Sequence, residues 1–150
     1  MIAIRETCVE DAEIVSSMIS ALLSELSGND RRPAIEPRLA AELLTATNRV
    51  FGFLAFDGDR PIGVIMVTEA AALFASGIYG IITELYVVPE CRSSGVAKLL
   101  IGAASELGRR HGWKQLEVGA PPQPTWSRSL AFYLNFGFIE IGPRLSLSLT

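Results

Sequence analysis

The chain has 150 residues, of which 49% are apolar and 19% charged, enough for one hydrophobic core and too few for two large domains. We therefore expect a single domain over residues 1–150. Thirteen Lys and Arg residues against sixteen Asp and Glu residues give a formal net charge of −3, without the basic excess that nucleic-acid binding requires.

The N-terminal part of the chain predicts a strand and two helices. Residues 2–5 alternate as a short strand, and Thr7 with Glu10 forms a capping box at the start of a helix. This helix should end at Gly28, and a shorter helix should follow over residues 38–45. Apolar residues at three- and four-residue steps predict the inward faces: Ala12, Val15, Ile19, Leu22, Leu23 and Leu26 in the first helix, and Leu39, Leu43 and Leu44 in the second.

The middle of the chain predicts strands and the longest amphipathic helix. Residues 50–67 favour a hairpin that turns at Asp57-Gly58-Asp59, with both strands buried on both faces. Residues 70–80 are rich in Ala, Ser and Gly, so we expect a loop there, leading into a strand over residues 79–88. A helix over residues 95–111 should present an inward stripe of Val96, Leu99, Leu100, Ala103, Ala104 and Leu107.

The C-terminal part predicts a strand over residues 114–118 and a helix over residues 127–136, separated by a proline-rich connector. Residues 138–141 and 145–149 should pair as a last hairpin, whose outer strand offers an edge to a second copy in a homodimer. The whole order predicts an α+β fold. It should hold a mixed, mostly antiparallel sheet of six or seven strands, flanked by about four helices.

Several classes of protein are excluded by what the chain contains. The apolar runs are short, which argues against a membrane-spanning helix, and the first residues lack the pattern of a secretion signal. Two cysteines and one histidine are too few for a disulfide framework or a zinc site. We therefore expect a cytoplasmic protein with reduced thiols and no bound metal, which partners neither a membrane nor nucleic acid.

The most informative stretch is residues 84–100, which read ELYVVPECRSSGVAKLL. They predict a strand, a loop of small residues and a helix N-terminus, a geometry that presents unpaired backbone N–H groups to an anion. Gly95 and Ala97 keep the backbone approachable and Arg92 adds positive charge, so a pyrophosphate fits this loop. An ordinary strand-to-helix connection also needs small residues, and the loop alone favours neither interpretation.

The pattern Arg-x-x-Gly-x-Ala, after a strand that ends Leu-Tyr-Val-x-Pro-Glu, closely resembles the coenzyme A loop of the GNAT superfamily of N-acetyltransferases. Residues 130–138, LAFYLNFGF, resemble the second cofactor motif of that family. The opening strand, its capped helix and the central hairpin resemble the family's earlier elements in the same order. The resemblance thus covers nearly the whole chain, and no competing phosphate-binding motif occurs in it.

The resemblance implies an acetyl-CoA-dependent enzyme that passes an acetyl group directly to a primary amine of a small molecule or a peptide. It also implies a bulged strand that splays from its parallel neighbour and leaves main-chain groups free for the pantetheine arm of the cofactor. The cofactor residues carried over are Leu85, Tyr86 and Val87 on this strand, Arg92, Ser93, Ser94, Gly95, Val96, Ala97 and Lys98 around the pyrophosphate, and Ser129 and Phe132 on the short helix.

Two residues are candidates for the chemistry. Tyr133 matches the family's usual general acid, and the resemblance favours that role over a core tyrosine. Glu84 is our candidate for the general base, because strand alternation puts it on the face of Tyr86; a solvated carboxylate at the mouth of the site fits equally well. Cys91 and His111 have no partners that predict covalent catalysis, and an exposed helix terminus suits His111.

The acceptor and the acyl group stay open. Trp126 stands where many family members have an asparagine that contacts the pantetheine, so either the stiff loop over residues 119–125 compensates or Trp126 lines the acceptor pocket. The loop carboxylates of Glu25, Asp30, Glu36 and Glu69 could attract a cation, although such groups are more often merely solvated. Two further interpretations compete with the enzyme: a sensor or assembly module that binds acyl-CoA without turnover, and a GNAT enzyme that uses another acyl group.

Overall fold

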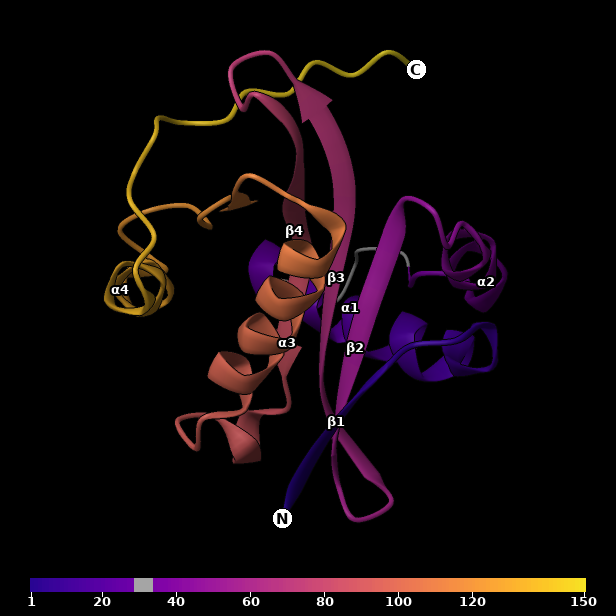
Figure 1. Cartoon of the computed structure of the whole chain (residues 1–150). Coiled ribbons are helices and arrows are strands. Elements are labelled where there is room, and N and C mark those ends of the chain that lie inside the picture. The colour runs from indigo at the N-terminus through magenta and orange to yellow at the C-terminus, as the bar shows by residue number, and fades with distance from the viewer. Residues whose placement is uncertain (29–33) are drawn as a thin grey trace.

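The strands of the protein form one sheet. The structure is a computed structural model that describes residues 1–28 and 34–150. Within these residues the sheet has five strands in the order β1-β2-β3-β4-β5 (Figure 1). Their bounds are Ile2–Glu6 for β1, Val50–Asp57 for β2, Arg60–Ala72 for β3, Gly77–Val87 for β4 and Leu116–Val118 for β5. All neighbours pair antiparallel except β4 and β5, which are parallel.

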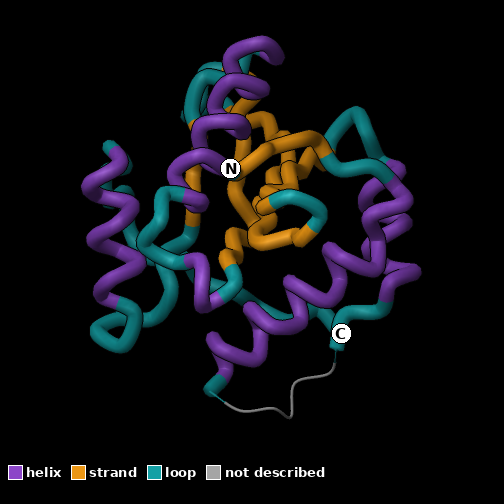
Figure 2. Tube along the Cα trace, turned by 90° about the horizontal axis from the view of Figure 1, so that it is seen from below, coloured by secondary structure: helices purple, strands orange, loops and turns teal. Residues whose placement is uncertain are grey.

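Helices cover both faces of this sheet. Figure 2 shows them surrounding the strands, and their bounds are Ala12–Ser27 for α1, Pro37–Thr45 for α2, Val96–His111 for α3 and Ser127–Phe136 for α4. Two single-turn helices, Val9–Asp11 and Pro89–Cys91, precede α1 and α3. The mixed, mostly antiparallel α+β architecture with four helices is confirmed for the described part of the chain.

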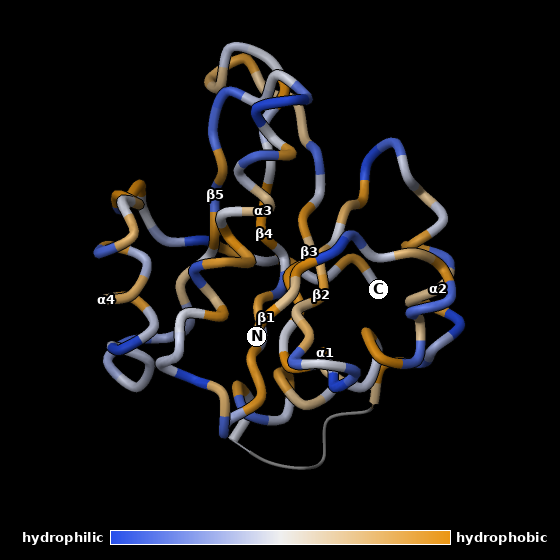
Figure 3. The backbone as a smooth tube through the Cα atoms, turned by 60° about the horizontal axis from the view of Figure 1, so that its bottom comes forward, coloured by the Kyte–Doolittle hydropathy of each residue, from blue (hydrophilic) through white to orange (hydrophobic). Residues whose placement is uncertain are grey.

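The core has two layers, because successive side chains of a strand point to opposite faces. On one face α3 packs against Ala55, Ile65, Val67 and Ile82. On the other face α1 and α2 pack against Leu54, Val64, Met66 and Tyr86. The central strands β2 and β3 are therefore buried on both faces, as predicted, and Figure 3 shows hydrophobic residues running along the strands in the middle of the molecule.

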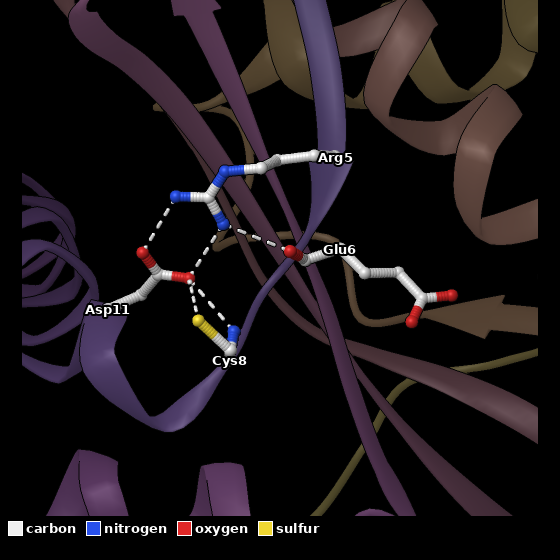
Figure 4. A network of polar contacts seen from close by, with 4 residues as sticks. All are labelled: Arg5, Glu6, Cys8 and Asp11. Carbon is white, nitrogen blue, oxygen red and sulfur yellow. Dashed lines mark hydrogen bonds and ion pairs between the residues drawn. The ribbon is translucent and has the colours of Figure 1, made fainter.

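The start of α1 is held by one carboxylate (Figure 4). Asp11 is 4% exposed and accepts two hydrogen bonds from the Arg5 guanidinium, at 2.8 and 2.9 Å. It also accepts the backbone N–H of Cys8 at 2.8 Å. Arg5 thereby ties the first strand to the first helix.

The capping box occurs one residue later than predicted. The sequence favoured Thr7 with Glu10, whereas the structure uses Cys8 with Asp11. The physical reason is that the backbone of Thr7 still follows the sheet: its N–H donates to the carbonyl of Gly52 at 2.9 Å. The helical turn can begin only after that bond.

Three leucines predicted to face the core are instead about half-exposed. In α2 the buried residues are Ala40 and Leu44, while Leu39 and Leu43 lie outside the core. In α3 the predicted Leu99 is exposed, and Ile101 takes its place in the core. In α2 the buried pair is four residues apart, and a residue one position before each is turned by about 100° from it. In α3 the inward face is turned toward Ile101, so Leu99, on the other side of Leu100, points outward.

The loop predicted over residues 70–80 was too long. Strand β3 continues to Ala72 and β4 begins at Gly77, so the two form an extended hairpin. Tyr79 pairs with Ala70 and is buried, which outweighs the poor strand propensity of the alanines and glycines around it. The tip of the hairpin exposes Leu73 and Phe74.

The predicted C-terminal hairpin does not form, so six or seven strands was too many. Residues 138–150 contain no strand and run from α4 to the upper end of the molecule in Figure 1. The side chain of Leu145 is 94% exposed. An isolated two-stranded hairpin is marginal in water, and the short β5 offers only three residues to pair with. A homodimer through residues 145–149 stays a prediction.

Trp113 anchors the place where β4 and β5 meet. Its indole N–H donates to the carboxylate of Glu69 at 2.6 Å, so this carboxylate has a structural role. Gly80 leaves room for the ring, since a Cβ added there would lie 2.4 Å from it. Gly80 is also the first residue of β4 that pairs with β5. Across residues 1–28 and 34–150, no helix has both the length and the apolar content needed to cross a bilayer.

Candidate active site

Strands β4 and β5 pair briefly and then separate. Their register has three pairs, from Gly80 with Leu116 to Ile82 with Val118. Beyond Ile82, β4 continues to Val87 while β5 has ended, so the edge of β4 has no neighbouring strand in the described residues. The expected splay between the two parallel strands is confirmed.

A β-bulge lies where the separation begins. Met66 pairs with Glu84 and Val67 pairs with Ile82, which leaves Thr83 as an inserted residue of β4. The insertion reverses the alternation of side chains. Ile82 packs in the α3 layer and Tyr86 packs in the α1 layer, so Glu84 shares the face of Tyr86. The expected bulge is therefore confirmed.

The main chain of β4 faces the open edge at alternate residues. The N–H of Val88 donates to the carbonyl of Ile62 in β3, at 2.9 Å. Because the main-chain groups of successive residues alternate in direction, those of Val87 and Leu85 face away from β3. The carbonyl of Val87 accepts the Nε–H of Arg92 at 2.8 Å. The N–H of Val87 remains directed to the open edge.

A cavity of about 930 Å³ opens at this edge. It reaches from Leu22 and Glu25 of α1 to Ser129 and Phe132 of α4. Every predicted catalytic and cofactor residue lines the cavity except Ser94, which lies in the same loop. The fold thus brings together predicted site residues that lie as far apart in the chain as Glu84 and Tyr133.

The loop before α3 presents a row of unpaired amides. In the described residues, none of the backbone N–H groups from Ser93 to Ala97 donates to an acceptor in the protein. The loop reaches this form through two left-handed residues, Ser93 with φ of 66° and Gly95 with φ of 90°. Gly95 directly precedes α3, so the positive end of the helix dipole adds to these donors. Such an arrangement suits a phosphate or pyrophosphate.

Arg92 is held by the protein itself. Besides the bond to Val87, its guanidinium donates to the carboxylate of Glu25 at 2.8 Å and lies 5.4 Å from the ring centroid of Tyr86. Hydrogen bonding to Glu25 raises the pKa of Arg92. The carboxylate of Glu25, which the sequence offered to a cationic ligand, is thus used to connect α1 to the loop. No sequence signal marks this pair, which is 67 residues apart.

Glu84 lies on β4 and contributes its carboxylate to the lining of the cavity. Burial raises its pKa, and a hydrogen bond from the Thr83 hydroxyl, at 2.6 Å, acts in the opposite direction. A raised pKa makes a carboxylate a better proton acceptor at neutral pH. Thr83 was missed by the sequence analysis, because a bulge leaves no signature in a run of strand residues.

Tyr133 lies on α4 beside this cavity. Its ring packs edge-on against Phe138, with the centroids 5.6 Å apart, and burial raises its pKa to about 12. Among the described residues the hydroxyl has no hydrogen-bond partner, although it is not fully enclosed. The phenol is therefore protonated at neutral pH and available as a donor.

Other residues singled out by the sequence have simpler surroundings. Trp126 is the N-cap of α4 and lines the cavity. Cys91, a free thiol, also lines the cavity. His111 packs edge-on against Phe51, away from the cavity lining. Glu36 is the N-cap of α2, and Asp30 lies outside the described residues. No cluster of His, Cys, Asp and Glu side chains in the described residues could hold a metal ion.

Comparison with known proteins identifies a matching family and fold. The family described as the acetyltransferase (GNAT) family matches residues 17–138. No curated protein matches the sequence. An aminoglycoside acetyltransferase from an uncultured soil metagenomic sample has a similar structure, with a TM-score of 0.81, 17% identity, and coverage of 100% of this chain and 99% of that one.

Two further solved structures match over nearly the full length of both chains. A ribosomal-protein-alanine N-acetyltransferase from Brucella melitensis biovar Abortus has a TM-score of 0.78 at 17% identity, with 100% of each chain covered. A predicted acetyltransferase with acetyl-CoA from Clostridium acetobutylicum has a TM-score of 0.79 at 17% identity, covering 99% of this chain and 97% of that one. At such identities the likeness concerns the fold alone.

Proposed function

Because this chain belongs to the GNAT acetyltransferase family, we propose that it is an acetyl-CoA-dependent N-acetyltransferase that acts on a primary amine of a small molecule or a peptide. One observation carries the proposal. The unpaired amides before α3 open into the same cavity as a partly buried carboxylate, Glu84, and a partly buried phenol, Tyr133. An anion site next to an acid and a base suits transfer from a phosphate-bearing thioester.

The loop and the open strand edge fit the cosubstrate. The amides of residues 93–97 would hold the pyrophosphate, and Lys98 adds positive charge beside them. The outward main-chain groups of Leu85 and the carbonyl of Val87 would pair with the amides of the pantetheine arm. Ser129 and Phe132 would flank that arm from α4. When bound there, acetyl-CoA supplies an activated acetyl thioester.

Three groups of the chain would then assist the transfer. Glu84 accepts the proton that the amine loses as it forms the new bond to carbon, either directly or through a water molecule. The N–H of Val87 stabilises the negative charge that develops on the carbonyl oxygen. Tyr133 donates a hydrogen bond to the sulfur as the carbon–sulfur bond breaks. Since its pKa is about 12 and that of a thiol is roughly 8.5, this help is hydrogen bonding rather than full proton transfer.

The experiment that tests this function is a thiol-release assay. The purified chain is incubated with acetyl-CoA and a panel of amines: polyamines, aminoglycosides, lysine and peptides with free N-termini. Aminoglycosides and peptides belong in the panel because structural neighbours are named for such acceptors. We expect release of free coenzyme A with one class of amine and a mass gain of one acetyl group on that acceptor.

The controls separate the alternatives. Glu84→Gln should bind acetyl-CoA, measured by calorimetry, but release thiol more slowly. Tight binding of acetyl-CoA without thiol release for any amine would instead support the sensor or assembly module. A higher kcat/KM with another acyl-CoA in competition would support a different acyl donor.

A further inference from the structure

The bulge of β4 creates a contact that a regular strand cannot make. Consecutive side chains of a strand point to opposite faces, so neighbours do not bond to each other. Here the inserted residue Thr83 donates its hydroxyl hydrogen to the carboxylate of Glu84, with the two oxygens 2.6 Å apart. The bulge therefore gives the Glu84 carboxylate a hydrogen-bond donor from the neighbouring residue.

The hydroxyl of Thr83 has a choice of two acceptors. The carbonyl of Met66, which lies on β3 opposite the bulge, is 3.3 Å away. A hydroxyl carries a single hydrogen, and a bond to an ionised carboxylate is both shorter and stronger than a bond to a neutral carbonyl. The contact with Glu84 is therefore the dominant one, and the carbonyl of Met66 is the alternative acceptor.

In the described residues, no other side chain forms a hydrogen bond or an ion pair with the Glu84 carboxylate. The other charged groups that line the cavity are Glu25 of α1, Arg92 and Lys98 near the start of α3, Arg128 of α4 and Arg144 of the tail, residues 138–150. Its weak acids, besides Glu84, are Tyr86, Cys91 and Tyr133. None of them forms a hydrogen bond or an ion pair with Glu84, and the pKa of Glu84 responds only to burial and to Thr83.

We propose that Thr83 is a positioning residue for acetyl transfer: its hydroxyl holds the Glu84 carboxylate in the orientation that meets the acceptor amine and stabilises its ionised form. The inference rests on the proposed function, in which Glu84 is the general base. Without the hydroxyl, the carboxylate would be free to rotate and would hold its proton to higher pH. The first effect misplaces the base at every pH, and the second keeps it protonated over more of the acidic range.

The test compares two substitutions in the full-length protein. Thr83→Val removes the hydroxyl at nearly constant shape, and Thr83→Ser retains it. Thr68→Val is the matched control, because Thr68 lies on β3 outside the cavity lining. With the amine acceptor found in the thiol-release assay, kcat/KM is measured across pH, and thermal melting confirms that each variant folds. Thr83→Ala replaces Thr83→Val if the valine variant does not fold.

We expect Thr83→Val to lower kcat/KM about tenfold at neutral pH and to move the acidic limb of the profile to higher pH. Thr83→Ser should keep the wild-type profile, and so should Thr68→Val. The proposal is overturned if Thr83→Val keeps the wild-type limb, or if Thr83→Ser moves it as far as Thr83→Val does.

A second measurement needs no activity. Carbon-13 NMR of the glutamate carboxyl groups follows the titration of Glu84 in the protein alone, and the signal is assigned by its absence in Glu84→Gln. We expect its midpoint to rise in Thr83→Val and to stay in place in Thr83→Ser. An unchanged midpoint in Thr83→Val refutes the contact, whereas absence of thiol release with every amine refutes the proposed function and leaves this titration intact as the test of Thr83.

Discussion

At the scale of single residues, the hydroxyl of Tyr133 separates turnover from mere binding. The substitution Tyr133→Phe removes only that oxygen and keeps the ring that packs against Phe138. The fold and the affinity for acetyl-CoA should survive, while the rate of acetyl transfer should fall by roughly 10² to 10³-fold, as it does on loss of one donor to a developing negative charge, if departure of the thiolate limits the reaction. Single-turnover kinetics with the true acceptor measures this rate directly.

Steady-state rates alone would not decide the role of Tyr133, because product release can limit turnover. Phe132→Leu is a suitable companion, since it alters the neighbouring ring and leaves the phenol in place. Equal single-turnover rates for Tyr133→Phe and the wild type would remove the hydroxyl from the chemistry.

Asp11 gives the protein a pH-dependent contribution to stability. The hydrogen bond from Arg5 is the main cause that lowers the pKa of Asp11 from 3.8 to about 2. A pKa that is lower in the folded state stabilises the fold above the unfolded value and loses this effect as pH falls toward 2. Asp11→Asn should therefore cost about 1 to 2 kcal/mol at neutral pH, discounted because Arg5 is half-exposed.

Urea unfolding of both proteins at several pH values measures this difference in free energy. The gap between wild type and Asp11→Asn should narrow as the pH is lowered from 4 toward 2, since Asp11 becomes increasingly protonated in the unfolded and then in the folded protein. Asp59→Asn, in the turn between β2 and β3, is the control and should change little. A gap that is as large at pH 2 as at pH 6 contradicts the assigned cause.

At the scale of elements, the loop that leads into α3 decides whether the cavity holds a phosphate. A Cβ added at Gly95 would meet no atom of the protein within 4 Å, so the site has room for a side chain when empty. Gly95→Glu should nevertheless abolish binding of coenzyme A. The new carboxylate would occupy the space of the pyrophosphate and repel its charge, which isothermal calorimetry would measure.

The left-handed backbone complicates this variant, because Gly95 has a φ of 90°. Gly58 offers a matched control: it has a φ of 63°, equally open surroundings, and a place in the turn between β2 and β3 outside the cavity lining. Gly58→Glu carries a similar conformational strain and should bind coenzyme A like the wild type. Unchanged affinity in Gly95→Glu would show that the amides of residues 93–97 do not hold the pyrophosphate.

The separation of β4 from β5 places the other parts of the site. Because β5 ends at Val118, the main chain of β4 beyond Ile82 is free to bind a ligand in place of a strand. Glu25 on α1 accepts a hydrogen bond from Arg92 in the loop before α3, and both residues line the cavity. The site therefore depends on where two strands end as much as on the residues they carry.

At the scale of the whole molecule, a ligand bound across this cavity should stabilise the fold. Acetyl-CoA at about 100 times its Kd would add roughly 2.7 kcal/mol, which for a domain of this size corresponds to a rise in Tm of about 5 to 10 °C. Differential scanning calorimetry measures the shift. We expect it in the wild type, Tyr133→Phe and Gly58→Glu, and we expect its loss in Gly95→Glu. A wild-type Tm that does not respond to saturating acetyl-CoA would contradict the assigned site.

Features that depend on local patterns could be predicted from the order of the amino acids. The periodicity of α1, α3 and α4, the turn at Asp57-Gly58-Asp59 and the run from Glu84 to Leu100 predicted the elements and the family, because helix faces, tight turns and a phosphate loop are encoded by neighbouring residues. The predicted site residues gathered in one cavity for the same reason: most of them belong to two short motifs.

Features that depend on partners far apart in the chain became visible only in the folded structure. The bulge at Thr83 depends on the pairing of β3 with β4, in which β4 has one residue more than β3 at this point. The Glu25–Arg92 contact joins residues 67 positions apart. The alternation of residues 145–149 predicted a strand, but a strand forms only where a sheet edge is there to receive its hydrogen bonds. In the described structure no such edge meets the tail, and the same pattern remains an exposed segment.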